Sequence, residues 1–103
     1  MSSIKISKPL FDLPINYETT HYSVRRLVRE EYVRLQDGKC WYCEKPLTGK
    51  PSKKVRKSNI RKELFPPNFF DWPCHLHHNH DTGMTIGAVH ARCNAHLWQY
   101  HGE

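Results

Sequence analysis

Apolar residues recur at intervals of three and four between Ser23 and Gln36, and this is the most regular pattern in the chain. At helical spacing they form one stripe, made by Val24, Leu27, Val28, Tyr32 and Leu35. Arginine and glutamate side chains lie away from the stripe. The pattern predicts an amphipathic helix over 23–36, with Ser23 as its N-cap and Gly38 as the C′ residue after its end.

A different pattern begins at Trp72 and predicts a hairpin followed by a helix. Residues 72–78 fit a strand, residues 79–83 contain the turn sequence Asp-Thr-Gly, and residues 85–89 fit a returning strand. A helix is predicted from His90 onward, because polar and apolar residues recur there at helical spacing. Alternation divides the side chains of the first strand between two faces: Cys74, Leu76 and His78 on one, and His75 and His77 on the other.

The segments outside these elements are less regular. Residues 1–22 are predicted to form an irregular arm that either reaches toward a second protomer or packs on the core through Leu10, Phe11, Leu13 and Ile15. Residues 64–72 are apolar and aromatic, and two consecutive prolines exclude a regular helix there, so we expect this segment to pack beneath the first strand. Trp98 and Tyr100, near the C-terminus, either face the core or contact a second protomer, and the core is preferred.

The main basic run is an insert at residues 50–63, which contains Val55 and Ile60 as its only aliphatic residues before Leu64. This composition predicts a loop or a poorly packed hairpin. Its positive charge is almost unopposed, which favours contact with phosphate groups over a merely solvated insertion.

Composition limits the class of protein. A chain of 103 residues, 38% of them hydrophobic, suits a single domain with a small core, for which a bound metal would be a useful staple. Lysine and arginine outnumber acidic residues by 16 to 10, and the net charge of +6 favours a polyanionic partner. No stretch resembles a signal peptide or a membrane span, so we expect a cytoplasmic protein that does not bind membranes.

The cysteine spacing indicates a structural metal site. Cys40 and Cys43 form a Cys-x-x-Cys pair, and Cys93 follows much later. With no export signal, zinc binding is a better explanation than disulfides. The fourth ligand is either His90, which lies three residues before Cys93, or Cys74 on the hairpin; His90 is preferred, and Cys74 would then be a small buried residue.

A second polar cluster remains after zinc takes its ligands. It consists of His75, His77, His78, His80 and Asn94. Neutral imidazoles bind divalent ions and accept protons from water near pH 7, so this many in one short segment predicts a second, catalytic site.

Together these residues resemble the HNH endonucleases. The matching features are a helix ending in Gly-x-Cys-x-x-Cys, then HLHHNHDTG, then a hairpin return into HARCN. Within the family, the chain is most similar to the zinc-stapled branch that includes phage recombination endonuclease VII. The resemblance covers roughly residues 24–97, leaves the basic insert unaligned, and implies an α+β chain with a ββα-metal core in a bacterial or phage-encoded protein.

The resemblance also implies roles for individual residues. His78 corresponds to the general base, while His77 and Asn94 correspond to ligands of the catalytic divalent ion. His75 and His80 match flanking histidines that orient the base or contact the scissile phosphate. The chain departs from the endonuclease VII pattern at three positions: His77 and Asn79 replace aspartates, and His90 replaces a zinc-binding cysteine.

The implied activity is one-metal hydrolysis of DNA, with Mn²⁺ or Mg²⁺ as the catalytic ion. The imidazole at position 77 would also suit Co²⁺ or Ni²⁺. One active site would nick one strand and leave 5′-phosphate and 3′-hydroxyl ends, in a monomer or a homodimer. The residues expected to contact DNA are Arg25, Arg29, Lys53, Lys54, Arg56, Lys57, Arg61 and Arg92. Two other functions fit parts of the pattern: a non-catalytic zinc module that binds nucleic acid, and a Cys-x-x-Cys thiol oxidoreductase.

Overall fold

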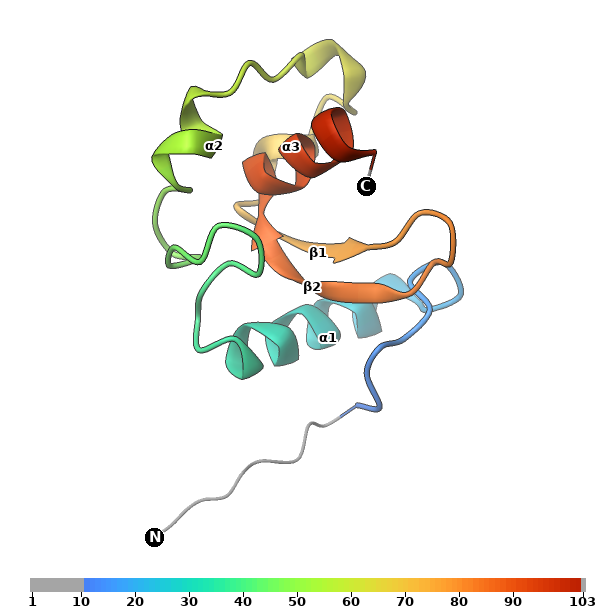
Figure 1. Cartoon of the computed structure of the whole chain (residues 1–103). Helices are drawn as coiled ribbons and strands as arrows, with labels where there is room; N and C mark the ends of the chain where they lie inside the picture. The colour runs from blue at the N-terminus through green and yellow to red at the C-terminus, as the bar shows by residue number, and fades with distance from the viewer. Residues whose placement is uncertain (1–10, 103) are drawn as a thin grey trace, which may run out of the picture.

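A computed structural model describes residues 11–102, so the predicted core contact of Leu10 lies outside the described range. In chain order the elements are α1 (Tyr22–Leu35), α2 (Lys53–Lys57), η2 (Lys62–Leu64), η3 (Phe69–Asp71), β1 (Cys74–His78), β2 (Thr85–His90) and α3 (Ala91–His101). β1 and β2 form a two-stranded antiparallel sheet, with α1 on one side and α3 on the other (Figure 1). The predicted α+β class and the order helix, hairpin, helix are confirmed.

The caps of α1 differ from the prediction by one or two residues. The Nδ1 atom of His21, and not the hydroxyl of Ser23, caps the helix by accepting the Ser23 N–H at 3.2 Å. At the other end Asp37, with φ of 57°, takes the C′ position predicted for Gly38. Gly38 follows in the same left-handed region, and its N–H bonds back to the last helical turn at 2.8 Å.

The buried stripe of α1 is narrower than the sequence pattern predicts. Its buried residues are Val28, Glu31 and Tyr32. Leu27 and Leu35 are each 46% exposed, because a two-stranded sheet covers only a narrow strip of the helix. The buried carboxylate of Glu31 instead forms a bidentate ion pair with Arg34, at 2.6 and 3.1 Å.

The pairing of β1 with β2 contains an irregularity near the predicted site. His77 lies opposite Gly87, whereas His78 lies opposite Thr85, so Ile86 is an extra residue on β2. Such a shift interrupts the simple alternation of side chains and bends the strand. It occurs between the two histidines for which the alternation was used to predict opposite faces.

The predicted turn at residues 79–83 is confirmed, although a different side chain closes it. The Oδ1 atom of Asn79 accepts the backbone N–H groups of Asp81 and Thr82, at 2.8 and 2.9 Å. Gly83 supplies the positive φ, at 79°. The side chain that closes the turn is therefore that of Asn79, which comes before the Asp-Thr-Gly sequence.

The arm packs on the core and forms an isolated β-bridge between Asn16 and Met84, next to the start of β2. The Tyr17 N–H donates to the Gly83 carbonyl at 2.7 Å, and the Thr85 N–H donates to the Ile15 carbonyl at 2.9 Å. The arm residues that are partly buried against the core are Phe11, Leu13, Ile15 and Tyr17. Of the two alternatives for the arm, packing on the core is therefore confirmed for residues 11–17.

The basic insert is folded, contrary to the prediction of a loop or poorly packed hairpin. It forms α2, whose Val55 side chain is 1% exposed and belongs to the core. The guanidinium of Arg92, from α3, donates hydrogen bonds to the carbonyls of Val55, Arg56 and Ser58 at 3.2, 3.2 and 2.8 Å. These bonds satisfy carbonyls at the C-terminal end of α2, which a five-residue helix cannot satisfy by itself.

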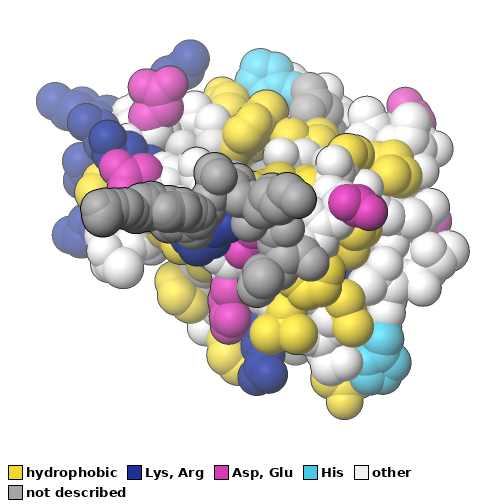
Figure 2. All heavy atoms as spheres, turned by 90° about the horizontal axis from the view of Figure 1, so that it is seen from below, with side chains coloured by type: hydrophobic (Ala, Val, Ile, Leu, Met, Phe, Trp, Pro, Cys, Tyr) yellow, Lys and Arg dark blue, Asp and Glu magenta, His cyan; other side chains and the backbone are white. Residues whose placement is uncertain are grey.

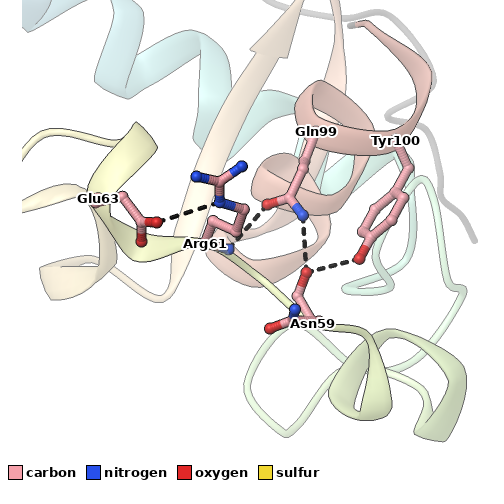
Figure 3. Close-up of polar contacts among 5 residues, drawn as sticks. All are labelled: Asn59, Arg61, Glu63, Gln99 and Tyr100. Atoms are coloured by element: carbon pink, nitrogen blue, oxygen red, sulfur yellow. Dashed lines mark hydrogen bonds and ion pairs between the residues drawn. The ribbon is translucent and has the colours of Figure 1, made fainter.

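The second half of the insert is also held against α3 (Figure 3). The Gln99 side chain accepts the Arg61 N–H at 2.9 Å and donates to the Asn59 carbonyl at 2.8 Å. The Tyr100 hydroxyl donates to the same carbonyl at 2.6 Å. Tyr100 is 50% exposed, so its predicted burial in the core is wrong, and its hydroxyl instead fixes the course of the insert.

Residues 64–72 avoid regular helix as predicted and form two 3₁₀ turns, η2 and η3, around an aromatic cluster. The Phe65 ring lies 4.7 Å from Phe69 and 5.5 Å from Trp98, centroid to centroid. Trp98 remains 41% exposed, so it is a surface neighbour of this cluster and not the core residue that was predicted. The cluster ends beside β1, where Phe69 contacts His75 at 4.6 Å.

Gly87 is required where α1 meets β2. A Cβ atom there would lie 2.7 Å from Oε1 of Gln36 and 3.1 Å from Cβ of Trp41. The Gln36 amide cannot easily move, because it bonds to both the N–H and the carbonyl of Ala88, each at 2.9 Å.

We expect Gly87→Ala to lower the free energy of unfolding by roughly 1–3 kcal/mol, the usual cost of overpacking, which corresponds to several degrees in Tm. Thermal unfolding followed by circular dichroism measures this loss. Gly49→Ala is the matched control, because a Cβ at Gly49 meets nothing closer than 3.7 Å. Equal melting temperatures for the two variants would contradict the steric explanation.

Candidate metal centre and histidine cavity

Four side chains from three separate segments converge on one point. They are Cys40, Cys43, His90 and Cys93, whose ligand atoms all lie within 4.8 Å of one another. In tetrahedral zinc sites, Zn–S of about 2.3 Å and Zn–N of about 2.05 Å place sulfur and nitrogen about 3.6 Å apart. The Nδ1 atom of His90 lies 3.5 Å from the Cys43 sulfur and 3.6 Å from the Cys93 sulfur. The cluster therefore suits a structural metal such as zinc.

Local backbone structure positions the two cysteines of the Cys-x-x-Cys pair. Residues 39 and 46 form an isolated bridge, and the Cys40 N–H donates to the Lys45 carbonyl at 2.9 Å. Glu44 adopts φ of 67°, which turns the chain back after Cys43. The Trp41 N–H donates to the Ala88 carbonyl at 2.9 Å and so attaches this knuckle to β2.

The tautomer of His90 suits a metal ligand. Its Nε2–H donates to the Pro46 carbonyl at 2.9 Å, which leaves the Nδ1 lone pair directed at the sulfurs. This second hydrogen bond orients the ring as in other histidine-bound metal sites. Cys74 lies outside the cluster, so the structure supports His90 as the fourth ligand.

The cysteine thiols differ in their electrostatic surroundings. A hydrogen bond from the Cys93 thiol lowers the pKa of Cys40 to about 4, despite the opposing effect of burial. Burial raises the pKa of Cys74, and the charge of Arg29 only partly offsets this effect. All four cysteines are free thiols in this structure. A thiolate at Cys40 suits metal binding. Cys74 was predicted to be a small buried residue, but it is only partly buried at the edge of the core.

The polar cluster of β1 and α3 is centred on the amide of Asn94. Nδ1–H of His77 donates to Oδ1 of Asn94 at 3.2 Å, and the Asn94 NH₂ group donates to Nδ1 of His75 at 3.1 Å. His77 is only 1% exposed, whereas His75 is partly exposed. Burial, together with the nearby Arg29 charge, lowers the pKa of His75, which fits its role as an acceptor. The structure thus brings these three predicted site residues together.

The His78 ring stacks on Tyr17, a contact that no sequence pattern predicted. Its ring lies 4.0 Å from the ring of Tyr17 at an interplanar angle of 7°. The Arg25 guanidinium also lies over the Tyr17 ring, 4.0 Å from its centroid, and donates to the Tyr17 carbonyl at 2.8 Å. Burial, then the nearby imidazoles of His80 and His77, lower the pKa of His78. A lowered pKa keeps this imidazole neutral, as a proton acceptor must be.

A cavity of about 410 Å³ joins the histidines to the arginines of α1. The polar residues in its lining include Arg25, Arg26, Arg29, His75, His78, His80 and Asn94. His75 and His78 share this cavity, although strict alternation predicted opposite faces. The register shift of the hairpin lies between His77 and His78, next to this site. His77 is buried and does not line the cavity, but it is hydrogen-bonded to Asn94, which does.

Two cavity residues were not among the predicted site residues: Arg26 and Tyr17. Arg26 lies on the polar face of the predicted helix, together with Arg25 and Arg29, where a contact with phosphate and a solvated position were both possible. Tyr17 lies in the arm, which has no periodic pattern, and nothing in the sequence connects it with His78. Tyr17 comes close to His78 because the arm is hydrogen-bonded to the hairpin turn at Gly83.

The predicted DNA-contacting residues do not form one site. Arg25 and Arg29 line the cavity, Arg92 bonds to the carbonyls of α2, and Arg61 pairs with Glu63 at 3.1 Å. The basic side chains of α2 are all exposed: Lys53, Lys54, Arg56 and Lys57. Seen from below, most visible lysine and arginine side chains gather at one edge of the molecule (Figure 2). The positive charge is therefore concentrated and not spread evenly over this face.

No family model matches the chain, and comparison with curated proteins and with solved structures finds no significant match. Within residues 11–102, no helix has the length and apolar character that crossing a membrane requires. The function of the cavity is therefore inferred from its own geometry and chemistry.

Proposed function

We propose that this chain is a metal-dependent DNA endonuclease of the HNH type, whose ββα-metal core consists of β1, β2 and α3. One observation carries the proposal: three arginines of α1 line the same cavity as His75, His78, His80 and Asn94. Arginines bind the phosphate diester, and an imidazole beside them accepts the proton of a water molecule. The resemblance of the HLHHNHDTG and HARCN segments to HNH endonucleases supports the same reaction.

In this mechanism His78 is the general base. Its ring is neutral because burial and the neighbouring imidazoles lower its pKa, and its orientation is fixed by the stack on Tyr17. His78 takes a proton from water as the water oxygen forms a bond to phosphorus. The bond from phosphorus to the 3′ oxygen breaks, and that oxygen leaves with a proton from solvent. The products are 5′-phosphate and 3′-hydroxyl ends.

His77 and Asn94 are the residues that would hold the catalytic divalent ion. Their Nδ1 and Oδ1 atoms lie 3.2 Å apart, close to the separation of about 3 Å between adjacent ligands of an octahedral ion. To act as a ligand, the His77 ring would carry its proton on Nε2 in place of Nδ1. Mn²⁺ or Mg²⁺, or Co²⁺ or Ni²⁺, would supply stabilisation of the negative charge on the phosphate and the departing oxygen. His75 holds the Asn94 amide in place from the other side.

The exposed basic face of α2 supports DNA as the partner. Arg92 and Gln99 hold the insert against α3, so its lysines project from a fixed backbone. Contacts with phosphate groups then cost little backbone entropy on binding. Arg92 itself has a structural role in this arrangement. The same surface favours a second candidate, a non-catalytic zinc module that binds nucleic acid, in a monomer or a homodimer.

The proposal is tested with supercoiled plasmid incubated with the zinc-loaded chain in Mn²⁺, Mg²⁺, Co²⁺ or Ni²⁺, or without an added divalent ion. We expect nicked circles in Mn²⁺ or Mg²⁺ and none without an added divalent ion, with ends that DNA ligase reseals directly. Ligase sealing requires a 5′-phosphate and a 3′-hydroxyl, so it identifies the bond that breaks. Plasmid binding without cutting in any of the four divalent ions would favour the binding module.

Tyr17 is expected to act as a positioning residue for His78. Because the stack fixes the imidazole, we expect Tyr17→Leu to lower kcat by about 10- to 100-fold while changing KM little, since small displacements of catalytic groups have effects of this size. Tyr17→Phe is the matched control, because it keeps the ring, and we expect it to retain most of the activity. A loss in Tyr17→Phe equal to that in Tyr17→Leu would assign the effect to the hydroxyl and contradict the stacking role.

A further inference from the structure

A second cavity adjoins the cavity that is lined by the α1 arginines and the histidines, and it has a different chemistry. Its volume is about 240 Å³, and its apolar walls are Leu64, Phe65, Pro66, Phe69 and Trp98. His80, Asn94 and Phe69 line both cavities. The apolar cavity, called the aromatic compartment below, and the cavity lined by arginines and histidines, called the cationic cavity, therefore share one boundary.

The walls of the aromatic compartment are held by contacts among the rings. Phe65 meets Trp98 edge-on at 5.5 Å and meets Phe69 at 4.7 Å. Phe69 in turn meets His75 edge-on at 4.6 Å. Because His75 bonds to Asn94, the aromatic rings are connected directly to the polar cluster of the proposed active site.

We propose that this aromatic compartment binds one unpaired nucleobase of the nucleic acid whose phosphate occupies the cationic cavity. A nucleotide has this same pair of chemistries, a flat apolar ring system next to an anionic phosphate, and bases bind proteins by stacking on aromatic side chains. An apolar cavity of about 150 Å³ accepts a benzene ring, so 240 Å³ suits a base of one or two rings. This inference rests on the proposed function for the position of the phosphate.

The walls indicate an unpaired base and not a base within a duplex. A stacked and paired base presents only its edge, whereas a ring that enters a compartment lined by Phe65, Phe69 and Trp98 must leave the stack. The preferred substrate is therefore a single strand, or a duplex with a bulge or mismatch beside the scissile phosphate. An apolar peptide side chain would fill the compartment but would leave the adjoining arginines without an anion.

The test measures binding, so it does not depend on cleavage. The zinc-loaded full chain carrying His78→Ala is titrated into a matched duplex containing 2-aminopurine, and into the same duplex with that base as a single-nucleotide bulge. We expect the bulged duplex to bind at least about fivefold more tightly, the lower end of the stacking effect per base, with a change in 2-aminopurine fluorescence on binding. Adding Trp98→Ala should remove both differences, while Leu35→Ala, at an exposed position on α1, should keep them.

Three outcomes would overturn the proposal: equal affinity for the two duplexes, an equal loss for both in Trp98→Ala, or a dimer in sedimentation that Trp98→Ala dissociates without changing DNA binding. Failure of the base site and failure of the proposed hydrolysis are distinguishable. If the base site alone is wrong, the wild-type chain nicks plasmid but does not discriminate the bulge. If hydrolysis alone is wrong, the bulge preference and its dependence on Trp98 remain, and plasmid stays intact.

Discussion

Replacing His78 by alanine should lower the rate of metal-dependent plasmid nicking by about 10²- to 10⁴-fold, the usual contribution of a general base. The imidazole is the group in the cavity that has both a lowered pKa and a fixed orientation on Tyr17. Alanine removes the proton acceptor and leaves the arginines of α1 in place, so DNA affinity should change much less than the rate. Initial rates of plasmid nicking and equilibrium binding to a short duplex measure these two effects separately.

His101→Ala is the matched control for His78→Ala. His101 is exposed at the end of α3, outside the lining of the histidine cavity, and its replacement should leave nicking unchanged. Both variants should bind zinc and melt like the wild-type chain. Undiminished nicking by the His78 variant would remove His78 as the base, and equal losses in both variants would show a general effect of histidine removal.

The largest effect on stability is expected from loss of the metal ligands. Cys93→Ala removes a fully buried ligand, and structural zinc contributes on the order of 10 kcal/mol in apparent terms. Domains of this size are typically stable by about 5–15 kcal/mol, so we expect the variant to bind no zinc and to be largely unfolded. Elemental analysis of the purified chain and far-ultraviolet circular dichroism measure the two results. A strong chelator should produce the same unfolding in the wild-type chain.

Cys74→Ala separates the metal site from a general need for cysteine. Cys74 lies outside the cluster of four ligands, so this variant should keep one zinc per chain and a cooperative melting transition. A folded Cys93 variant that retained zinc would contradict the assignment of that ligand. Loss of zinc from the Cys74 variant would instead restore the alternative that Cys74 is the fourth ligand in place of His90.

The sequence alone was sufficient wherever the determining contacts are local. The spacing of three and four in α1, the turn residues between β1 and β2, and the Cys-x-x-Cys and His-x-x-Cys pairs each act within about one helical turn or one hairpin. The α+β order and the set of four metal ligands could therefore be predicted. The helix caps were wrong by one or two residues because several polar residues competed for the same backbone groups.

Tertiary structure alone decided how the catalytic candidates are held. Tyr17 reaches His78 because the arm pairs with the turn at Gly83, and no local pattern encodes that pairing. The basic insert folds as α2 because Arg92, far along the chain, satisfies its terminal carbonyls. The position of Trp98 also depends on a contact between distant residues, because its neighbour Phe65 comes from a segment without a regular sequence pattern. Residues distant in sequence meet here through packing and long-range hydrogen bonds, whereas periodicity records only which side of a single element faces inward.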